Sequence, residues 1–179
     1  GASRGDRRQG RRAKRITNRA VGLVPEYMDQ EKLKAMENYG ESVLKFVKVA
    51  CDAMGHLDLA DLKAKLNSDV AGVYFENPGY LGTIEPNGQK ISDLAHEAGA
   101  LSLVGVDPIS LGVLSTPPTY GPAIVCGDLQ PLGIPMHYSG GQSGLLATLA
   151  DYQPVLDFPS RTLVTATPTP PAPSRSAHR

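Results

Sequence analysis

From residue 20 onward, short apolar runs alternate with segments whose apolar residues recur at helical spacing. Several of the runs are continuously apolar, which is typical of buried parallel strands because helices cover both faces of such a sheet. The pattern predicts strands at residues 20–24, 43–50, 70–75, 101–106, 123–126 and 145–149. Helical spacing predicts helices at about 29–39, after Asp58, and at about 89–98. The sequence therefore predicts an α/β fold, a mostly parallel sheet with flanking helices.

Two of these segments are distinctive. Residues 43–50 alternate polar and apolar positions, as a half-buried strand near the edge of a sheet would. Asp58 is a candidate N-cap, and Leu59, Leu62 and Leu66 form one apolar stripe behind it. We expect that helix to pack its leucines against the sheet.

The two ends of the chain differ from the body. Residues 1–19 carry eight Lys or Arg and one Asp, whereas residues 20–179 carry ten basic and 17 acidic groups. We call residues 1–19 the basic leader. It contains no aromatic residue that could stack on a base, so any contact with nucleic acid would be nonspecific contact with phosphates. Out-of-frame sequence and an import signal are alternative explanations of this segment. We predict disordered segments at 1–19 and 165–179, the latter rich in Pro, Ser and Thr, and a domain at 20–164.

Composition narrows the class of protein further. Cys51 and Cys126 lack metal-ligand spacing, which favours reduced, buried thiols. No apolar stretch reaches the roughly 18 residues that cross a bilayer, and no secretory apolar region follows the leader. We expect a soluble protein without membrane or nucleic-acid partners. A cytoplasmic location is favoured over a mitochondrial one.

Candidate chemistry lies just after the predicted strands, because ligands of open α/β sheets bind beyond the carboxyl ends of strands. Asn77-Pro78 follows one strand and Asp107-Pro108 follows another. In a pyridoxal-phosphate site, an ionised Asp holds the pyridine nitrogen protonated and an Asn donates to the ring hydroxyl. Either residue alone is more often a turn residue, but together and in this order they indicate a pyridoxal-phosphate wall.

Such an enzyme also needs a lysine that forms a Schiff base, on the turn after the next strand. Pro131 occupies that place. The lysines of the body all precede Asp107 and fall on predicted helices or an outer strand. The sequence therefore predicts a cofactor wall without its lysine.

Three stretches resemble a known family: AGVYFENPGYLG at 71–82, VGVDPISLGVL at 104–114 and YGPAIVCGDLQPLGIP at 120–135. They are similar to the N-terminal half, or separate first subunit, of glycine decarboxylase, the P-protein of the glycine cleavage system. The likeness extends over about residues 20–164. The order and distance of VDPISLG and the GD-x-Q-x-LGIP run make it specific.

The resemblance implies part of the large domain of the fold-type-I pyridoxal-phosphate transferases. It implies that Asn77 and Asp107 are a vestigial cofactor wall, and that the cofactor and the lysine belong to a partner subunit. It further implies glycine decarboxylation by that lysine-bearing second subunit, with transfer of the aminomethyl group to the lipoyl arm of H-protein. Gly140 and Gly141 match a family glycine pair that could cradle a phosphate, although a tight turn is the simpler interpretation.

Other functions stay open. The flanking regions of a complete first subunit are not evident, which also fits a non-catalytic remnant or interaction domain without activity. A nucleotide-binding α/β domain is disfavoured because no GxGxxG motif follows an early strand. Nothing in the sequence forms a Ser/His/Asp or metal constellation.

Overall fold

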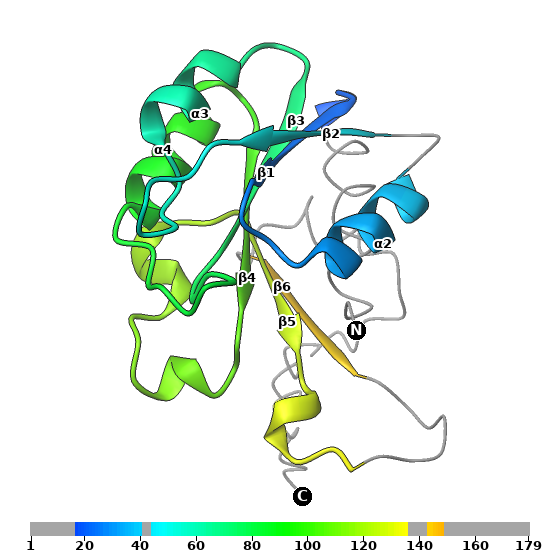
Figure 1. The fold of residues 1–179 in the computed structure, drawn as a ribbon, viewed down its shortest axis with the longest axis vertical. Helices are drawn as coiled ribbons and strands as arrows, with labels where there is room; N and C mark the ends of the chain where they lie inside the picture. Colours follow the sequence, from blue (N-terminus) through cyan, green and yellow to red (C-terminus); the bar gives the residue numbers. More distant parts are fainter. Residues whose placement is uncertain (1–16, 41–43, 136–142, 149–179) are drawn as a thin grey trace, which may run out of the picture.

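The computed structural model describes residues 17–40, 44–135 and 143–148, and these form a six-stranded sheet (Figure 1). Its strands lie in the order β2-β1-β3-β4-β5-β6. The first five strands along the chain run parallel, and the sixth is antiparallel to the fifth. The strands are β1 (Val21–Pro25), β2 (Lys45–Val49), β3 (Val70–Glu76), β4 (Leu101–Val106), β5 (Ile124–Asp128) and β6 (Gly144–Thr148). The predicted α/β fold with a mostly parallel sheet is confirmed, and β2 is an edge strand as expected.

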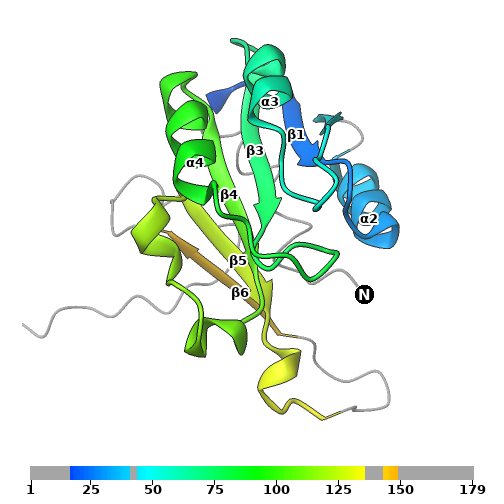
Figure 2. The same cartoon turned by 60° about the vertical axis from the view of Figure 1, so that its left-hand side comes forward.

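Three α-helices connect the first four strands: α2 (Gln30–Gly40), α3 (Leu59–Lys65) and α4 (Gly88–Glu97). Helix α2 covers one face of the sheet, and α3 and α4 cover the other (Figures 1 and 2). Short 3-10 turns follow β4 and β5, namely η1 (Ser110–Gly112), η2 (Pro117–Tyr120) and η3 (Gln130–Leu132). Each helix lies within one or two residues of its predicted bounds.

The sheet separates two apolar cores because successive residues of a strand point to opposite faces. On β3, Val73 and Phe75 pack toward α3 and α4, whereas Tyr74 packs toward α2. The neighbouring strand repeats this pattern, with Val104 on the first face and Leu103 on the second. On each strand, residues separated by an even number of positions from Tyr74 or Leu103 therefore point toward α2. The same holds for residues at the carboxyl ends of these strands.

Helix α3 begins as its sequence predicts. The Asp58 carboxylate accepts hydrogen bonds from the backbone N–H groups of Ala60, at 2.8 Å, and Asp61. Within the helix, Lys65 donates to Asp61 at 2.6 Å. The pair also reaches the edge strand, since Asp61 accepts from the Ala50 N–H at 2.7 Å and Lys65 donates to the Lys48 carbonyl at 2.8 Å.

Arg19 is tied to the folded domain, although the sequence assigns it to the basic leader. Its guanidinium donates to the carbonyls of Val70, at 3.1 Å, and Ala98, at 2.8 Å. Gly99 follows with a φ of +66°, and a Cβ atom there would lie 2.9 Å from the guanidinium. The ordered domain therefore includes Arg19. The rest of the leader up to residue 16, and the predicted tail at 165–179, lie outside the described residues.

Two remaining expectations concern the thiols and the membrane. Cys126 is buried and Cys51 is half-buried, and both are free thiols. Among the described residues, no helix has the length and apolar character that would let it cross a membrane. A cytoplasmic location stays a prediction.

Candidate functional site

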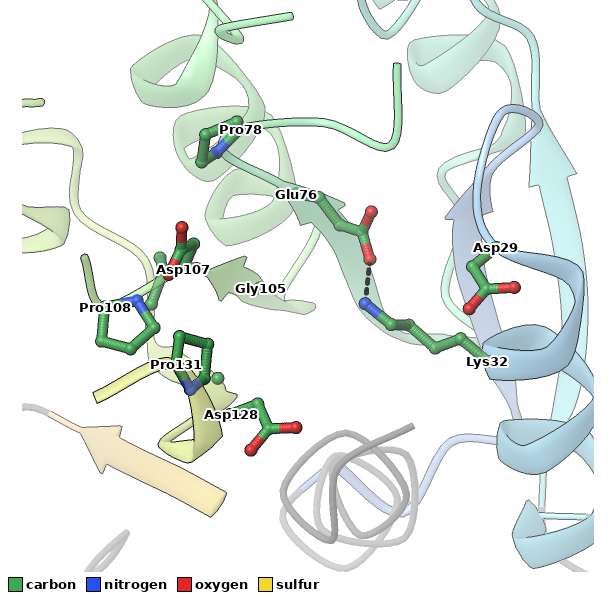
Figure 3. A pocket seen from close by; sticks show the side chains of 11 residues that line it. Asp29, Lys32, Glu76, Pro78, Gly105, Asp107, Pro108, Asp128 and Pro131 are labelled. Atoms are coloured by element: carbon green, nitrogen blue, oxygen red, sulfur yellow. Dashed lines mark hydrogen bonds and ion pairs between the residues drawn. The ribbon is translucent and has the colours of Figure 1, made fainter. Parts of the chain in front are cut away.

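A pocket of about 320 Å³ opens beyond the carboxyl ends of β3, β4 and β5. Its wall combines residues that end these strands with the first turn of α2 (Figure 3). This is where ligands bind in open parallel sheets. The lining residues are Asp29, Lys32, Glu76, Pro78, Gly105, Val106, Asp107, Pro108, Gly127, Asp128 and Pro131.

A lysine-glutamate-tyrosine cluster forms one side of the pocket. The Lys32 ammonium lies 2.6 Å from Glu76 Oε1, and the Tyr74 hydroxyl donates to the same oxygen at 2.8 Å. The Glu76 side chain is 9% exposed and that of Lys32 is 23% exposed. Since a buried carboxylate is stable only when it is paired, Lys32 and Tyr74 compensate the desolvation of Glu76.

Two glycines of the pocket wall lie too close to their neighbours to carry a side chain. A Cβ atom at Gly105 would overlap the Tyr74 hydroxyl and would lie 3.4 Å from Glu76 Cγ. A Cβ atom at Gly127 would lie 2.5 Å from the Val106 carbonyl oxygen. Because of these close contacts, neither position accepts a side chain without displacement of its neighbours. Both positions line the pocket.

Asp107 and Pro131 both line this pocket. Asp107 is exposed, and its carboxylate Oδ1 accepts from the Ile109 N–H at 3.0 Å. The residue therefore stabilises the turn after β4 while it also lines the pocket. Its proposed contact with a pyridine nitrogen stays a prediction.

Asn77 does not line the pocket. Asn77 lies two residues after Phe75, so its side chain points to the same face of the sheet, toward α4. There the side chain is buried, and it accepts a hydrogen bond from the Glu85 N–H at 3.3 Å. Asn77 also hydrogen-bonds Tyr120. Burial raises the pKa of the Tyr120 hydroxyl, and the hydrogen bond from Asn77 offsets part of this rise. Asn77 thus fastens the loop after β3, and the Asn77–Pro78 peptide bond is cis.

Gly140 and Gly141, the candidate phosphate loop, lie outside the described residues. Sequence reasoning gave no role to the four charged residues that line the pocket beside Asp107, namely Asp29, Lys32, Glu76 and Asp128. Lys32 falls on a helix, and the first turn of α2 points it into the pocket. Glu76 and Asp128 lie on the face of the sheet that α2 covers, as Tyr74 and Cys126 do, because residues two apart on a strand point to the same face.

Sequence comparison decides the family. The profile of the glycine cleavage system P-protein matches residues 12–166, which is most of the chain. The chain belongs to this P-protein family. A probable glycine dehydrogenase (decarboxylating) subunit 1 from Pyrococcus furiosus is 40% identical over 140 residues, which cover 78% of this chain and 31% of that protein. Its counterpart from Thermococcus onnurineus is 37% identical over 148 residues, which cover 82% and 33%.

Solved structures agree with this family and fold. Inhibitor-bound glycine decarboxylase, the P-protein, matches with a TM-score of 0.69 and 34% identity, over 82% of this chain and 33% of that one. A sphingosine-1-phosphate lyase from Burkholderia pseudomallei matches with a TM-score of 0.58 at 17% identity, over 85% and 36%, and shares the fold alone. The chain spans about a third of the length of the P-protein relatives that it matches. The predicted fold-type-I architecture of pyridoxal-phosphate enzymes is confirmed.

The pocket of this P-protein chain does not fit the cofactor of that fold. Pyridoxal phosphate carries an anionic phosphate and needs an available lysine. The described pocket wall holds four carboxylates against one ammonium, that of Lys32, and Glu76 already pairs with it. Pro131 stands where the sequence places the lysine of the catalytic half. The residues present therefore disfavour the cofactor in this pocket.

Proposed function

We propose that this chain acts as the non-lysine-bearing part of a glycine dehydrogenase (aminomethyl-transferring) complex. A second subunit would hold pyridoxal phosphate on its lysine and decarboxylate glycine. The aminomethyl group would then pass to the lipoyl arm of H-protein. The observation that carries this proposal is a P-protein chain whose pocket offers Pro131 and a paired Lys32 where a catalytic half would offer a reactive lysine.

A partner surface is supported by exposed apolar side chains on the loops that follow β3, β4 and β5. We call these six residues the apolar rim: Tyr80, Leu81, Ile84, Ile109, Val113 and Leu132. Each is more than half exposed, and Val113 is 91% exposed. Several large apolar side chains around one edge are typical of surfaces that a partner covers.

Reconstitution tests the proposal. The chain would be combined with the lysine-bearing subunit and with lipoylated H-protein, and glycine-dependent exchange of carbon dioxide would be measured. We expect exchange only when both subunits are present, and none when the lysine of the second subunit is replaced by alanine. In this chain, Lys32→Arg keeps the ion pair with Glu76 but removes the primary amine. We expect exchange to persist in that variant.

Two results would contradict the proposal. One is failure of the two chains to co-purify or to support exchange together. The other is loss of exchange in Lys32→Arg while its fold and its co-purification are intact. For the rim, Val113→Asp should weaken co-purification, whereas Tyr39→Asp, a change at the far end of α2, should not.

A further inference from the structure

Glu85 joins the loops that follow β2 and β3. Each oxygen of its half-buried carboxylate accepts one hydrogen bond, Oε2 from the Leu57 N–H at 2.9 Å and Oε1 from the Asn87 N–H at 3.0 Å. Leu57 belongs to the loop between β2 and α3, 28 residues before Glu85. Asn87 is the N-cap of α4, and its own side chain makes no capping bond. One carboxylate therefore ties the start of α4 to the neighbouring loop.

The backbone of Glu85 extends this connection to the loop after β4. Its N–H donates to Asn77 Oδ1 at 3.3 Å, and the Asn77 side chain also hydrogen-bonds Tyr120, which ends η2. Tyr120 is 8% exposed, and its ring packs against that of Phe75 at a centroid distance of 6.3 Å. Because the Tyr120 ring is fixed in the core, the loop that carries it is held to the same network.

The same bonds close the loop that carries half of the apolar rim. Residues 77 and 85 form the base of this loop, and Tyr80, Leu81 and Ile84 lie between them. Leu81 also touches the loop after β2, since a Cβ atom at Gly55 would lie 3.1 Å from Leu81 Cδ1. These exposed apolar side chains are thus set on a loop whose ends are fixed at Glu85.

The two acceptor bonds require a carboxylate at this position. A carboxylate accepts at both oxygens, whereas the amide of Gln has one oxygen and one N–H₂ donor. With Gln in place of Glu85, one of the two backbone N–H groups would face another donor. Glu85 also lies just before the N-terminus of α4, where the helix dipole favours a negative charge. A residue of the same shape without the charge therefore cannot hold both loops at once.

We propose that Glu85 is a positioning residue for the partner surface: it joins the loops after β2, β3 and β4 into one unit, which presents the apolar rim in the shape that the second subunit binds. These loops carry every rim residue except Leu132. A surface that is ordered in advance loses less entropy on association, so a partner binds it more tightly. The inference rests on the proposed function for the identity of the partner, whereas the joining of the loops is a property of the chain alone.

Hydrogen exchange on the isolated chain tests the joining of the loops. Glu85→Gln leaves one of the two N–H groups without an acceptor, and Glu85→Ala leaves both. In Glu85→Ala we expect amides in both residues 50–58 and residues 78–87 to exchange at least about tenfold faster, while the amides of β3 and β4 keep their protection. If Glu85→Ala loses the protection of its strands, Glu85→Gln carries the comparison. Glu97→Gln is the matched control, because Glu97 is an exposed carboxylate at the opposite end of α4.

Affinity for the second subunit separates positioning from a merely structural role. It would be measured by calorimetry at a temperature at which every variant is folded. We expect the dissociation constant to rise at least about tenfold for Glu85→Ala and by a smaller factor for Glu85→Gln, with Glu97→Gln equal to wild type. Unchanged exchange in residues 50–58, or a lower unfolding temperature with unchanged affinity, would overturn the proposal. A wild-type chain that does not bind the second subunit would instead contradict the proposed function, and the exchange measurement would still decide whether Glu85 joins the loops.

Discussion

Gly105 on β4 and the Tyr74 hydroxyl on β3 approach so closely that a Cβ atom at Gly105 would overlap the hydroxyl. The two residues lie two register positions apart, since Gly105 pairs with Glu76 and Leu103 pairs with Tyr74. The missing side chain therefore lets Tyr74 reach across and donate to Glu76. Stability of this part of the core and the geometry of the pocket wall depend on the same glycine.

Gly105→Ala should lower the free energy of unfolding by about 1–3 kcal/mol, because Tyr74 or the strand must shift to admit the methyl group. Urea unfolding followed by circular dichroism measures the effect. Gly112→Ala is the matched control, since no atom lies within 4 Å of a Cβ placed there. That variant should stay within about 0.5 kcal/mol of wild type. Equal stabilities for the two variants would contradict the overlap.

Asp58→Ala should destabilise the chain by about 1 kcal/mol, because two N–H groups in the first turn of α3 lose their acceptor. Asp58→Asn should retain most of the stability, since Asn caps helices about as well as Asp. The midpoints of thermal unfolding of the two variants would make the comparison. A midpoint for Asp58→Asn as low as that of Asp58→Ala would argue against a capping role.

Arg19→Ala should cost about 1–3 kcal/mol, because the carbonyls of Val70 and Ala98 lose a charged donor. Lys34→Ala provides the control, as an exposed cation on α2 whose removal should change stability by no more than about 0.5 kcal/mol. Chemical denaturation of both variants tests whether the ordered domain begins at or before Arg19. No difference between them would place Arg19 outside the cooperative unit.

Acid should weaken the contact between α3 and β2. Two hydrogen bonds lower the pKa of Asp61 below its ordinary value of 3.8. The bond from Lys65 has the larger effect, and the bond from the Ala50 N–H has the smaller one. Because the unfolded chain then binds the proton first, the contribution of Asp61 is present above its ordinary pKa and is lost as the pH falls through its folded pKa.

Urea midpoints measured from neutral pH down to about pH 3 should therefore converge for wild type and Asp61→Asn, with wild type the more stable at neutral pH. Asp69→Asn, which alters an exposed carboxylate just before β3, should follow wild type throughout. A constant gap between wild type and Asp61→Asn across this range would exclude a role for the charge of Asp61.

The fold could be predicted from the sequence because its local signals agree with one another. The continuous apolar run at 70–75 could only belong to a strand covered on both faces, and Asp58 marks the start of α3. The same continuity hid the parity of the strand. Glu76 and Asn77 follow each other, so they point to opposite faces of the sheet, but with apolar residues on both faces nothing in the run indicates which of the two faces α2.

The candidate site was predictable only in part for a related reason. Asp107 and Pro131 follow strands directly, so their place at the carboxyl edge follows from topology. Lys32 reaches the pocket from a helix 44 residues before Glu76, and only the packing of α2 on the sheet sets that approach. The order of residues along the chain carries no signal for it.

The contacts between α3 and β2 also affect how the chain meets other chains. An edge strand presents unpaired N–H and C=O groups to which a foreign strand can add, which is a common route to aggregation. Here the Asp61 carboxylate takes the N–H of Ala50 and the Lys65 ammonium takes the carbonyl of Lys48. Exposed Lys45 and Lys48 add two charges along the same strand. Strand addition at this end of the sheet would have to break these bonds and desolvate both ammonium groups, which protects the folded chain from edge-to-edge association.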